Sequence, residues 1–353
     1  MSTKSAKGSL ITQRTKQLTF ALILLVLAST ASAQTIKIAT LAPEGTTWMI
    51  AMRAGAAEIK ERTEGRVKFK FYGGGVQGND RQVVRKMRIG QLHGGAFTSN
   101  AVSVFQKDAQ IYALPMLFSN IDEVSYVRER LDTRLRKLLE DAGYVNFGFA
   151  GGGFAHIMSK QPISNQADMQ GLKIWVPDGD ALSYGAVKAM GVSPVTMPLT
   201  DVLTGLQTEL IDTIMGPPAG TIVLQWNTAV SYITELPLAY IFAMLVIEKK
   251  VFNRLQTGDQ AIVREVMERV YVGFDEQGDA DNKAAYQALL DDGMTTVKPD
   301  EGQLDTWHRN VQVSNHKLAG EGFVSVELLV EIECYISAFR SGNLEENCTI
   351  PEG

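Results

Sequence analysis

The sequence has few of the residues that metal sites, disulfide scaffolds and nucleophilic catalysis require. Its 353 residues include only two cysteines and four histidines. The histidines, which are His93, His156, His308 and His316, are scattered and lack the spacing of metal ligands. No Walker A sequence, no G-x-S-x-G and no H-E-x-x-H occurs. We therefore expect no bound metal and no cofactor.

Basic residues are also in short supply. The chain has 34 Lys plus Arg against 39 Asp plus Glu, which gives a formal charge of -5. Four of the bases lie within residues 1–33, which contain no acid, so the rest of the chain carries a charge of -9. Nucleic acids and anionic membrane surfaces are bound mainly through Lys and Arg, so we expect neither as a partner. The length suggests roughly two domains.

The N-terminus has the pattern of a cleavable export signal. A basic stretch precedes the apolar run from Leu18 to Ala28, and Ala31-Ser32-Ala33 forms a small-residue cleavage site. The run is too short to span a bilayer, which disfavours the alternative of an uncleaved anchor. We predict a signal peptide over residues 1–33, cleavage after Ala33 and delivery to a bacterial periplasm.

The two cysteines, Cys334 and Cys348, both lie near the C-terminus. In an oxidising compartment a disulfide between them is expected, and a loop of this size would gain about 3 kcal/mol of stability. Two unpaired thiols are the alternative. Either arrangement would secure the C-terminal tail rather than take part in chemistry.

Strand and helix patterns alternate along the chain. Apolar alternation predicts a first strand from Thr35, and a helix follows over about 48–62. The apolar segment from Leu238 to Ile247 predicts a buried strand that crosses between domains, and residues 249–340 are mostly helical in pattern. This order predicts an α/β fold with mostly parallel sheets, arranged as a hinged pair of lobes.

A glycine-rich segment, Gly73 to Gly78, fits the dinucleotide-binding pattern G-x-G-x-x-G between a strand and a helix. However, the acid expected about 20 residues later is missing, since that region reads Ala96-Phe97-Thr98-Ser99. A glycine turn that lets the backbone approach a ligand or another loop is the favoured interpretation. An exported dinucleotide-dependent oxidoreductase is kept as a less favoured alternative.

Several separate motifs occur in one characteristic order: Gly171-Leu-Lys-Ile-Trp-Val-Pro177, Gly191-Val-Ser-Pro-Val-Thr-Met-Pro-Leu199 and Thr204-Gly-Leu-Gln-Thr-Glu-Leu-Ile-Asp212. With them the chain resembles the DctP-type substrate-binding proteins of tripartite ATP-independent periplasmic (TRAP) transporters. The resemblance implies a two-lobed periplasmic binding protein with crossing strands, a long domain-spanning helix and no enzymatic activity. It also implies delivery of a small-molecule ligand to TRAP membrane permease subunits.

The resemblance also gives a division of the chain into lobes. We predict that lobe I comprises residues 34–153 plus about 241–280. Lobe II would comprise residues 154–240 plus about 281–353, including the C-terminal helices.

The departures from the family pattern concern the residues that usually hold a substrate carboxylate. Trp175 stands where the family usually has Arg, Gly216 where it usually has Asn, and Phe154-Ala155 where acid-binding members often have a base. Losing two charge-assisted donors would weaken carboxylate binding by roughly two to four orders of magnitude. Aromatic rings favour apolar surface instead. We therefore predict an apolar or amphipathic ligand, larger than a dicarboxylate, with Trp175 and Phe154 as cleft walls.

Other residues fall near positions that face or flank the family's cleft. The apolar candidates are Trp48, Leu41 and Leu199, and the polar ones that would orient a headgroup are Thr98, Gln77 and Asp178. The alternative ligand is a small organic acid held by other groups, such as Lys173, Arg53 or backbone amides at helix starts. The apolar replacements are similar to those of a TRAP subgroup that works with a periplasmic tetratricopeptide-repeat protein, which makes such a protein a candidate partner.

Overall fold

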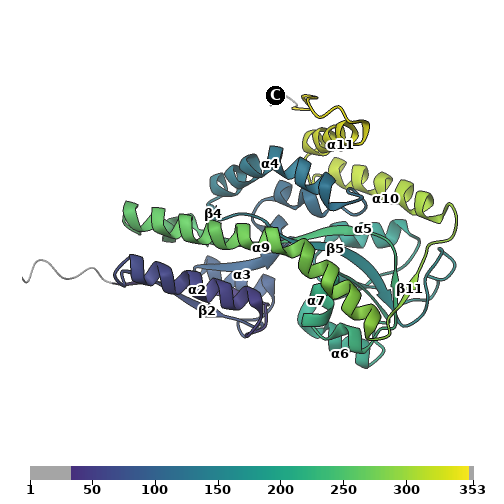
Figure 1. Cartoon of the computed structure of the whole chain (residues 1–353), viewed down its shortest axis with the longest axis horizontal. Coiled ribbons are helices and arrows are strands. Elements are labelled where there is room, and N and C mark those ends of the chain that lie inside the picture. The colour runs from purple at the N-terminus through teal and green to yellow at the C-terminus, as the bar shows by residue number, and fades with distance from the viewer. Residues whose placement is uncertain (1–32, 350–353) are drawn as a thin grey trace, which may run out of the picture.

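The computed structural model describes residues 33–349 and has two α/β lobes (Figure 1). The predicted signal peptide lies outside the described residues, apart from Ala33. Among the described residues, no helix has the length and apolar character needed to span a bilayer. The predicted two-lobed α/β architecture is confirmed.

The first lobe is built on three parallel strands. β1 (Gln34–Thr40) lies between β2 (Val67–Tyr72) and β3 (Gly94–Thr98) and pairs with both. Two helices, α2 (Thr47–Arg62) and α3 (Asp80–Arg88), connect these strands. Asn79 and Gln82 form a capping box at the start of α3, which fixes where that helix begins.

Two long strands cross between the lobes. β10 (Ala239–Glu248) runs antiparallel to β3 of the first lobe and to β5 (Ala150–Ser159). β5 in turn pairs antiparallel with β8 (Thr213–Gly216) and β9 (Tyr232–Thr234) of the second lobe. The prediction of mostly parallel sheets was therefore wrong, because the two crossing strands enter the sheet antiparallel to their neighbours.

The helix α9 (Thr257–Asp291) has 35 residues and lies across both lobes (Figure 1). It packs against α2, against the crossing strand β5, and against α7 (Pro218–Val223) in the second lobe. Glycines allow the close approach to β5, since a Cβ added at Gly278 would overlap the carbonyl oxygen of Gly151. The predicted domain-spanning helix is confirmed.

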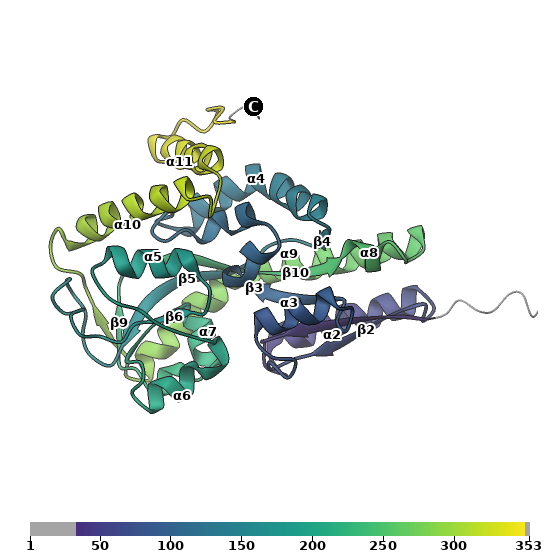
Figure 2. The same cartoon turned by 180° about the vertical axis from the view of Figure 1, so that it is seen from behind.

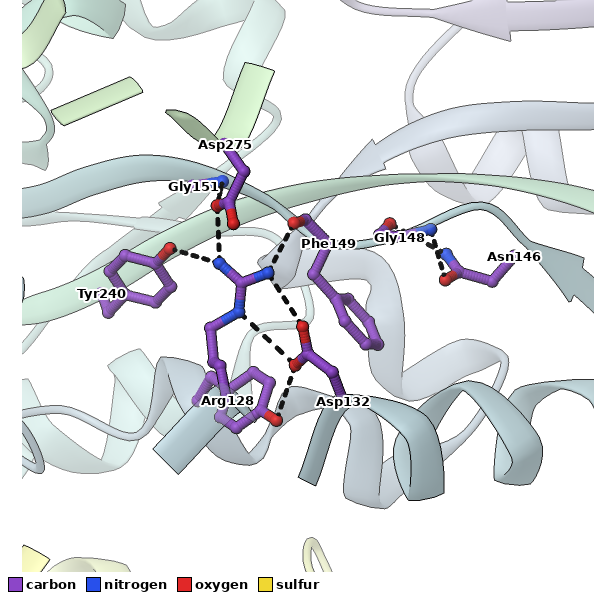
Figure 3. A network of polar contacts seen from close by, with 9 residues as sticks. Arg128, Asp132, Asn146, Gly148, Phe149, Gly151, Tyr240 and Asp275 are labelled. Atoms are coloured by element: carbon purple, nitrogen blue, oxygen red, sulfur yellow. Dashed lines mark hydrogen bonds and ion pairs between the residues drawn. The ribbon is translucent and has the colours of Figure 1, made fainter. Parts of the chain in front are cut away.

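A buried arginine joins three elements and the residue that precedes β5 (Figure 3). Arg128, on α4 (Ile121–Asp141), donates hydrogen bonds to Asp132 on the same helix at 2.9 Å and to the Phe149 carbonyl at 2.7 Å. It also donates to Asp275 on α9 at 2.6 Å and to the Tyr240 hydroxyl on β10 at 3.2 Å. Tyr112, on the 3-10 helix η2 (Lys107–Ala113), donates to Asp132 at 2.8 Å.

The two C-terminal helices pack on different lobes. α10 (Gln303–Gly320) lies along α5 (Ala181–Ala189) of the second lobe, whereas α11 (Val326–Ser341) lies on α4 of the first (Figure 2). The predicted division placed all of residues 281–353 with the second lobe. The apolar face of α11 contacts the first lobe instead, through the cluster that contains Leu328, Leu329 and Ile332. A disulfide joins Cys334 to Cys348 and holds the following tail against α11.

The remaining elements are short. They are the 3-10 helices η1 (Ser99–Val104), η3 (Leu199–Asp201) and η4 (Trp226–Thr228), the strands β4 (Tyr144–Asn146), β6 (Trp175–Pro177), β7 (Val195–Met197) and β11 (Thr295–Val297), and the helices α6 (Val202–Gln207) and α8 (Lys249–Phe252).

Candidate functional site

A cavity of about 90 Å³ lies between the two lobes. The first lobe contributes the loop after β1, the start of α3, the end of β3 and η1. The second lobe contributes the loops that follow β6 and β7. The lining residues are Leu41, Asn79, Asp80, Arg81, Val84, Thr98, Asn100, Ala101, Ser103, Val104, Pro177, Asp178, Gly179, Pro198 and Leu199.

A second, smaller cavity of about 30 Å³ adjoins the first and shares Asn100 and Pro177 with it. Its walls are largely apolar and come mostly from the second lobe and the crossing strands; they include Met190, Met215 and Ile241. The two cavities together therefore offer a polar part near α3 and an apolar part beneath the crossing strands.

Four of the predicted ligand residues meet in the first cavity: Leu41, Thr98, Asp178 and Leu199. They come from both lobes and from four separate chain segments, which is why only the family resemblance could group them. Arg81, the one basic side chain among the residues that line the two cavities, is absent from the site predicted from the sequence. The capping pattern Asn79-Asp80 marked the start of α3, but nothing in the sequence indicated that this helix points into the cleft.

Trp175 lines neither cavity, although the sequence predicts it as a wall. Its side chain is 2% exposed and packs edge to face on Trp226, with ring centroids 5.2 Å apart. The indole N–H donates to the Met197 carbonyl at 3.1 Å, and the Asp178 N–H donates to the same oxygen at 3.2 Å. Trp175 thus supports the two loops that carry Asp178 and Leu199 rather than facing the cavity.

Phe154 and Gly216 also lie outside both cavities. The Phe154 ring packs on Tyr240 with a centroid separation of 5.8 Å. Gly216 was expected to leave room for a ligand. In the structure that space holds the Trp226 ring, since an added Cβ at Gly216 would lie 3.2 Å from Trp226 Cζ3.

Trp48 and Gln77 make contacts within the first lobe. Trp48 stacks on Phe274 of α9 with ring centroids 4.2 Å apart. Gln77 accepts hydrogen bonds from Lys86 Nζ through its side-chain and backbone oxygens, each at 2.9 Å. Neither residue lines a cavity.

The glycine-rich segment Gly73 to Gly78 is hydrogen-bonded to the chain on either side of Leu41, which lines the cavity. The Gly74 N–H donates to the Ala42 carbonyl at 2.8 Å, and the Gly75 N–H donates to the Thr40 carbonyl at 3.1 Å. The Gly78 N–H donates to the Gly75 carbonyl at 2.8 Å. Because these amides are paired within the fold, they are not presented to a phosphate, as a dinucleotide site would require.

Charged groups gather at the polar part of the first cavity. Burial raises the pKa of Asp80, at the start of α3, to about 7. Arg81 Nη1 lies 3.6 Å from the Asp178 carboxylate of the other lobe. Asp180 lies just beyond the cavity and caps α5 by accepting from the Ser183 N–H at 3.0 Å. Of these two neighbouring carboxylates, Asp178 therefore lines the cavity and Asp180 serves as a helix cap.

No group of three or more His, Cys, Asp or Glu side chains in residues 33–349 has the arrangement of a metal site. The histidines remain apart: His316 pairs with Glu333 at 3.0 Å, and His93 accepts from the Lys37 N–H at 3.1 Å. Neither histidine lines either cavity.

The sequence profile of the bacterial extracellular solute-binding proteins, family 7 (DctP), matches residues 38–321. The chain belongs to this family. The matched part includes both lobes, the crossing strands and all fifteen residues of the first cavity. The cavity of this solute-binding protein thus lies where both matched lobes meet.

Several similar proteins are named for the ligand that they bind. The solute-binding protein is 26% identical to the 2,3-diketo-L-gulonate-binding periplasmic protein YiaO of Escherichia coli over 60% of this chain and 65% of that protein. It is 22% identical to the C4-dicarboxylate-binding periplasmic protein DctP of Rhodobacter capsulatus over 68% of this chain and 74% of that protein. Some relatives are matched over less of their length, such as 48% of YiiZ from Salmonella typhimurium.

Solved structures share the fold. A TRAP periplasmic solute-binding protein from Xanthobacter autotrophicus with bound β-D-galacturonate has a TM-score of 0.77 and 20% identity, covering 86% of this chain and 99% of that chain. One from Sulfurospirillum deleyianum with bound succinate has a TM-score of 0.77 and 16% identity, covering 85% and 98%. Because the identities are only 20% and 16%, the likeness between these structures and the solute-binding protein concerns the fold.

Proposed function

We propose that the protein is the periplasmic solute-binding subunit of a TRAP transporter and captures a small amphipathic organic molecule between its lobes. The observation that carries this proposal is the pair of adjoining cavities, polar near α3 and apolar beneath the crossing strands. A ligand that touches both lobes favours their closed arrangement, which membrane permease subunits would then recognise.

The cavity walls suggest how such a ligand would lie. Arg81, Thr98 and Asn100 would hold the polar end in the first cavity, between the apolar side chains of Leu41 and Leu199. The apolar end would extend past Pro177 into the second cavity, toward Met190 and Met215. Trp175 would act indirectly, by fixing the loop that carries Leu199.

The size of the site favours a small ligand. The cavities measure about 90 and 30 Å³. Sites for drug-sized ligands usually enclose about 300–1,000 Å³. This comparison argues against the predicted preference for a ligand larger than a dicarboxylate. The ligands named for related structures, β-D-galacturonate and succinate, are also small.

A small organic acid without an extended apolar part is the second candidate, and Arg81 is the observation that favours it. The cations named from the sequence are engaged elsewhere: Lys173 Nζ donates to the Glu209 carbonyl at 2.9 Å, and Arg53 pairs with Glu44 at 2.6 Å. Arg81 lines the cavity and would supply the positive charge that position 175 lacks. The tetratricopeptide-repeat partner stays a prediction.

The test is native mass spectrometry of the protein purified from periplasm, followed by solvent extraction to identify any retained molecule. We expect a small amphipathic species with a polar group and an apolar chain. Leu199→Ala removes apolar surface from the cavity and should weaken retention roughly tenfold. Leu210→Ala is the matched control, because Leu210 is 56% exposed and lines neither cavity.

The outcomes separate the candidates. A short, fully polar acid on the protein would favour the second candidate. If no small molecule is retained, and neither hexanoate nor succinate raises the melting temperature, the proposed function is wrong.

A further inference from the structure

Arg81 reaches from the first lobe to the second. It is the second residue of α3, and its Nη1 lies 3.6 Å from the Asp178 carboxylate in the loop after β6. The capping box formed by Asn79 and Gln82 anchors the helix start, so the base of the arginine is held in place. The contact between Arg81 and Asp178 therefore joins the two lobes at the edge of the first cavity.

The guanidinium group of Arg81 packs directly on Gly179. A Cβ added at Gly179 would overlap Arg81 Nη2 and would lie 2.7 Å from Cζ and 2.9 Å from Nε. Most of the guanidinium group therefore occupies the space that a side chain would fill. Gly179 also has a φ of +85°, which favours glycine at this position.

The guanidinium is not committed to another contact. Among residues 33–349, its one ion pair is with Asp178, and that separation is too long for a hydrogen bond. The arginine side chain is 57% exposed and the Asp178 side chain 43% exposed, so both reach the edge of the cavity. An ion pair between exposed side chains contributes little free energy. The contact between Arg81 and Asp178 can therefore break and form again as the lobes open and close.

The lobes also meet beside this contact. A Cβ added at Gly75 in the first lobe would lie 3.3 Å from Thr200 Cγ2 in the second and 3.4 Å from Leu41 Cδ2. Leu41 itself lines the cavity. The rim is therefore closed by a polar contact at Arg81 and by an apolar contact at Gly75.

We propose that Arg81 is a latch between the lobes, by which we mean its contact with Gly179 and Asp178. By packing on Gly179 beside Asp178, Arg81 holds the cavity closed and sets how long a ligand is retained. This inference rests on the proposed function, because it concerns the closing of the same site. Arg81 is a positioning residue in this role, since it acts on the arrangement of the lobes. The latch requires both the long basic side chain in one lobe and the glycine in the other.

The experiment measures the distance between spin labels placed on the two lobes, at the exposed residues Lys68 and Gln170. Arg81→Gln and Gly179→Ala should each lower the ratio of short-distance to long-distance populations. The expected decrease is about two- to fivefold, the range for a half-exposed ion pair. Gly171→Ala is the matched control, because Gly171 has a φ of +78° and no atom within 4 Å of an added Cβ.

Three outcomes would overturn the latch: unchanged distances in both Arg81→Gln and Gly179→Ala, an equal change in Gly171→Ala, or a wild-type protein that shows only the long distance. Native mass spectrometry of the same samples keeps the two proposals distinguishable. A ligand retained by the wild type with unchanged distances in the variants rejects the latch alone. Distances that change as expected, in a protein that retains no small molecule and is stabilised by neither hexanoate nor succinate, reject the proposed function and leave the contact between lobes.

Discussion

Asp80 is subject to two opposing effects. It is the first residue of α3, where the helix dipole favours a negative charge, but it is also packed into the cavity wall. Burial dominates and raises the pKa of its carboxyl group to about 7, compared with an ordinary value near 4. The polar part of the cavity therefore changes its charge within the physiological pH range.

This shift predicts how stability depends on pH. The folded protein binds the Asp80 proton more tightly than the unfolded chain, so the contribution of this group decreases as pH rises from about 4 to about 7. We expect Asp80→Asn to lose less stability than the wild type over that interval. Thermal unfolding of both proteins at pH 5 and pH 8 measures the difference. Parallel melting curves at the two pH values would contradict the raised pKa.

Single residues also show what sequence reasoning could and could not give at the site. Leu41, Thr98, Asp178 and Leu199 were placed by their positions in the family pattern, and all four line the cavity. Trp175 was predicted as a wall because its position usually carries a ligand residue. Its orientation depends on Trp226, which is distant in sequence, and no pattern near position 175 reports that contact.

At the scale of elements, the strand crossing is secured by Arg128. The side chain is 10% exposed and joins α4 to α9, to β10 and to Phe149, the residue before β5 (Figure 3). Asp275 accepts from both Arg128 and the Gly151 N–H, the latter at 2.8 Å. This network fixes β5 at the edge of the first lobe, immediately before its glycine run.

We predict that Arg128→Leu destabilises the protein by about 3–5 kcal/mol, because it leaves Asp132 and Asp275 without their buried partner. Asp275→Asn keeps an acceptor for the Gly151 N–H and should cost about 1 kcal/mol. Denaturant unfolding measures both. Arg85→Leu, at an exposed position on α3, is the control and should change stability little. Equal effects of Arg128→Leu and Arg85→Leu would contradict the structural role of the network.

Most elements could be predicted from the sequence, but their directions could not. Apolar patterning located the crossing strand at Leu238–Ile247, and the structure has β10 at Ala239–Glu248. Patterning does not reveal whether a buried strand runs parallel or antiparallel to its neighbours, because a strand that is buried on both faces is apolar throughout in either direction. The antiparallel pairing of β10 with β3 depends on a chain reversal of more than 100 residues, which local sequence does not encode.

At the scale of the whole molecule, the C-terminal tail is tied back to the first lobe. The disulfide between Cys334 and Cys348 closes a loop with a sequence separation of 14. The Tyr126 hydroxyl on α4 donates to the Leu344 carbonyl at 3.0 Å, so the tail also reaches the neighbouring helix. The disulfide and this hydrogen bond together hold α11 on α4.

Replacing both cysteines by serine should lower the free energy of unfolding by about 2–4 kcal/mol, because the loop is no longer closed in the unfolded chain. Denaturant unfolding of the double variant and the wild type measures this. Arg128→Leu in the same background should add its own cost independently, since the two sites share no contact. A double variant as stable as the wild type would show that the hydrogen bonds of the tail are sufficient.

The order of strands in the sheet has a consequence for synthesis. β10 lies between β3 and β5, so the edges of both strands stay unpaired until the chain has been made as far as Glu248. Pairings between such distant segments form slowly. A nascent chain of this topology therefore has no finished lobe for most of its synthesis.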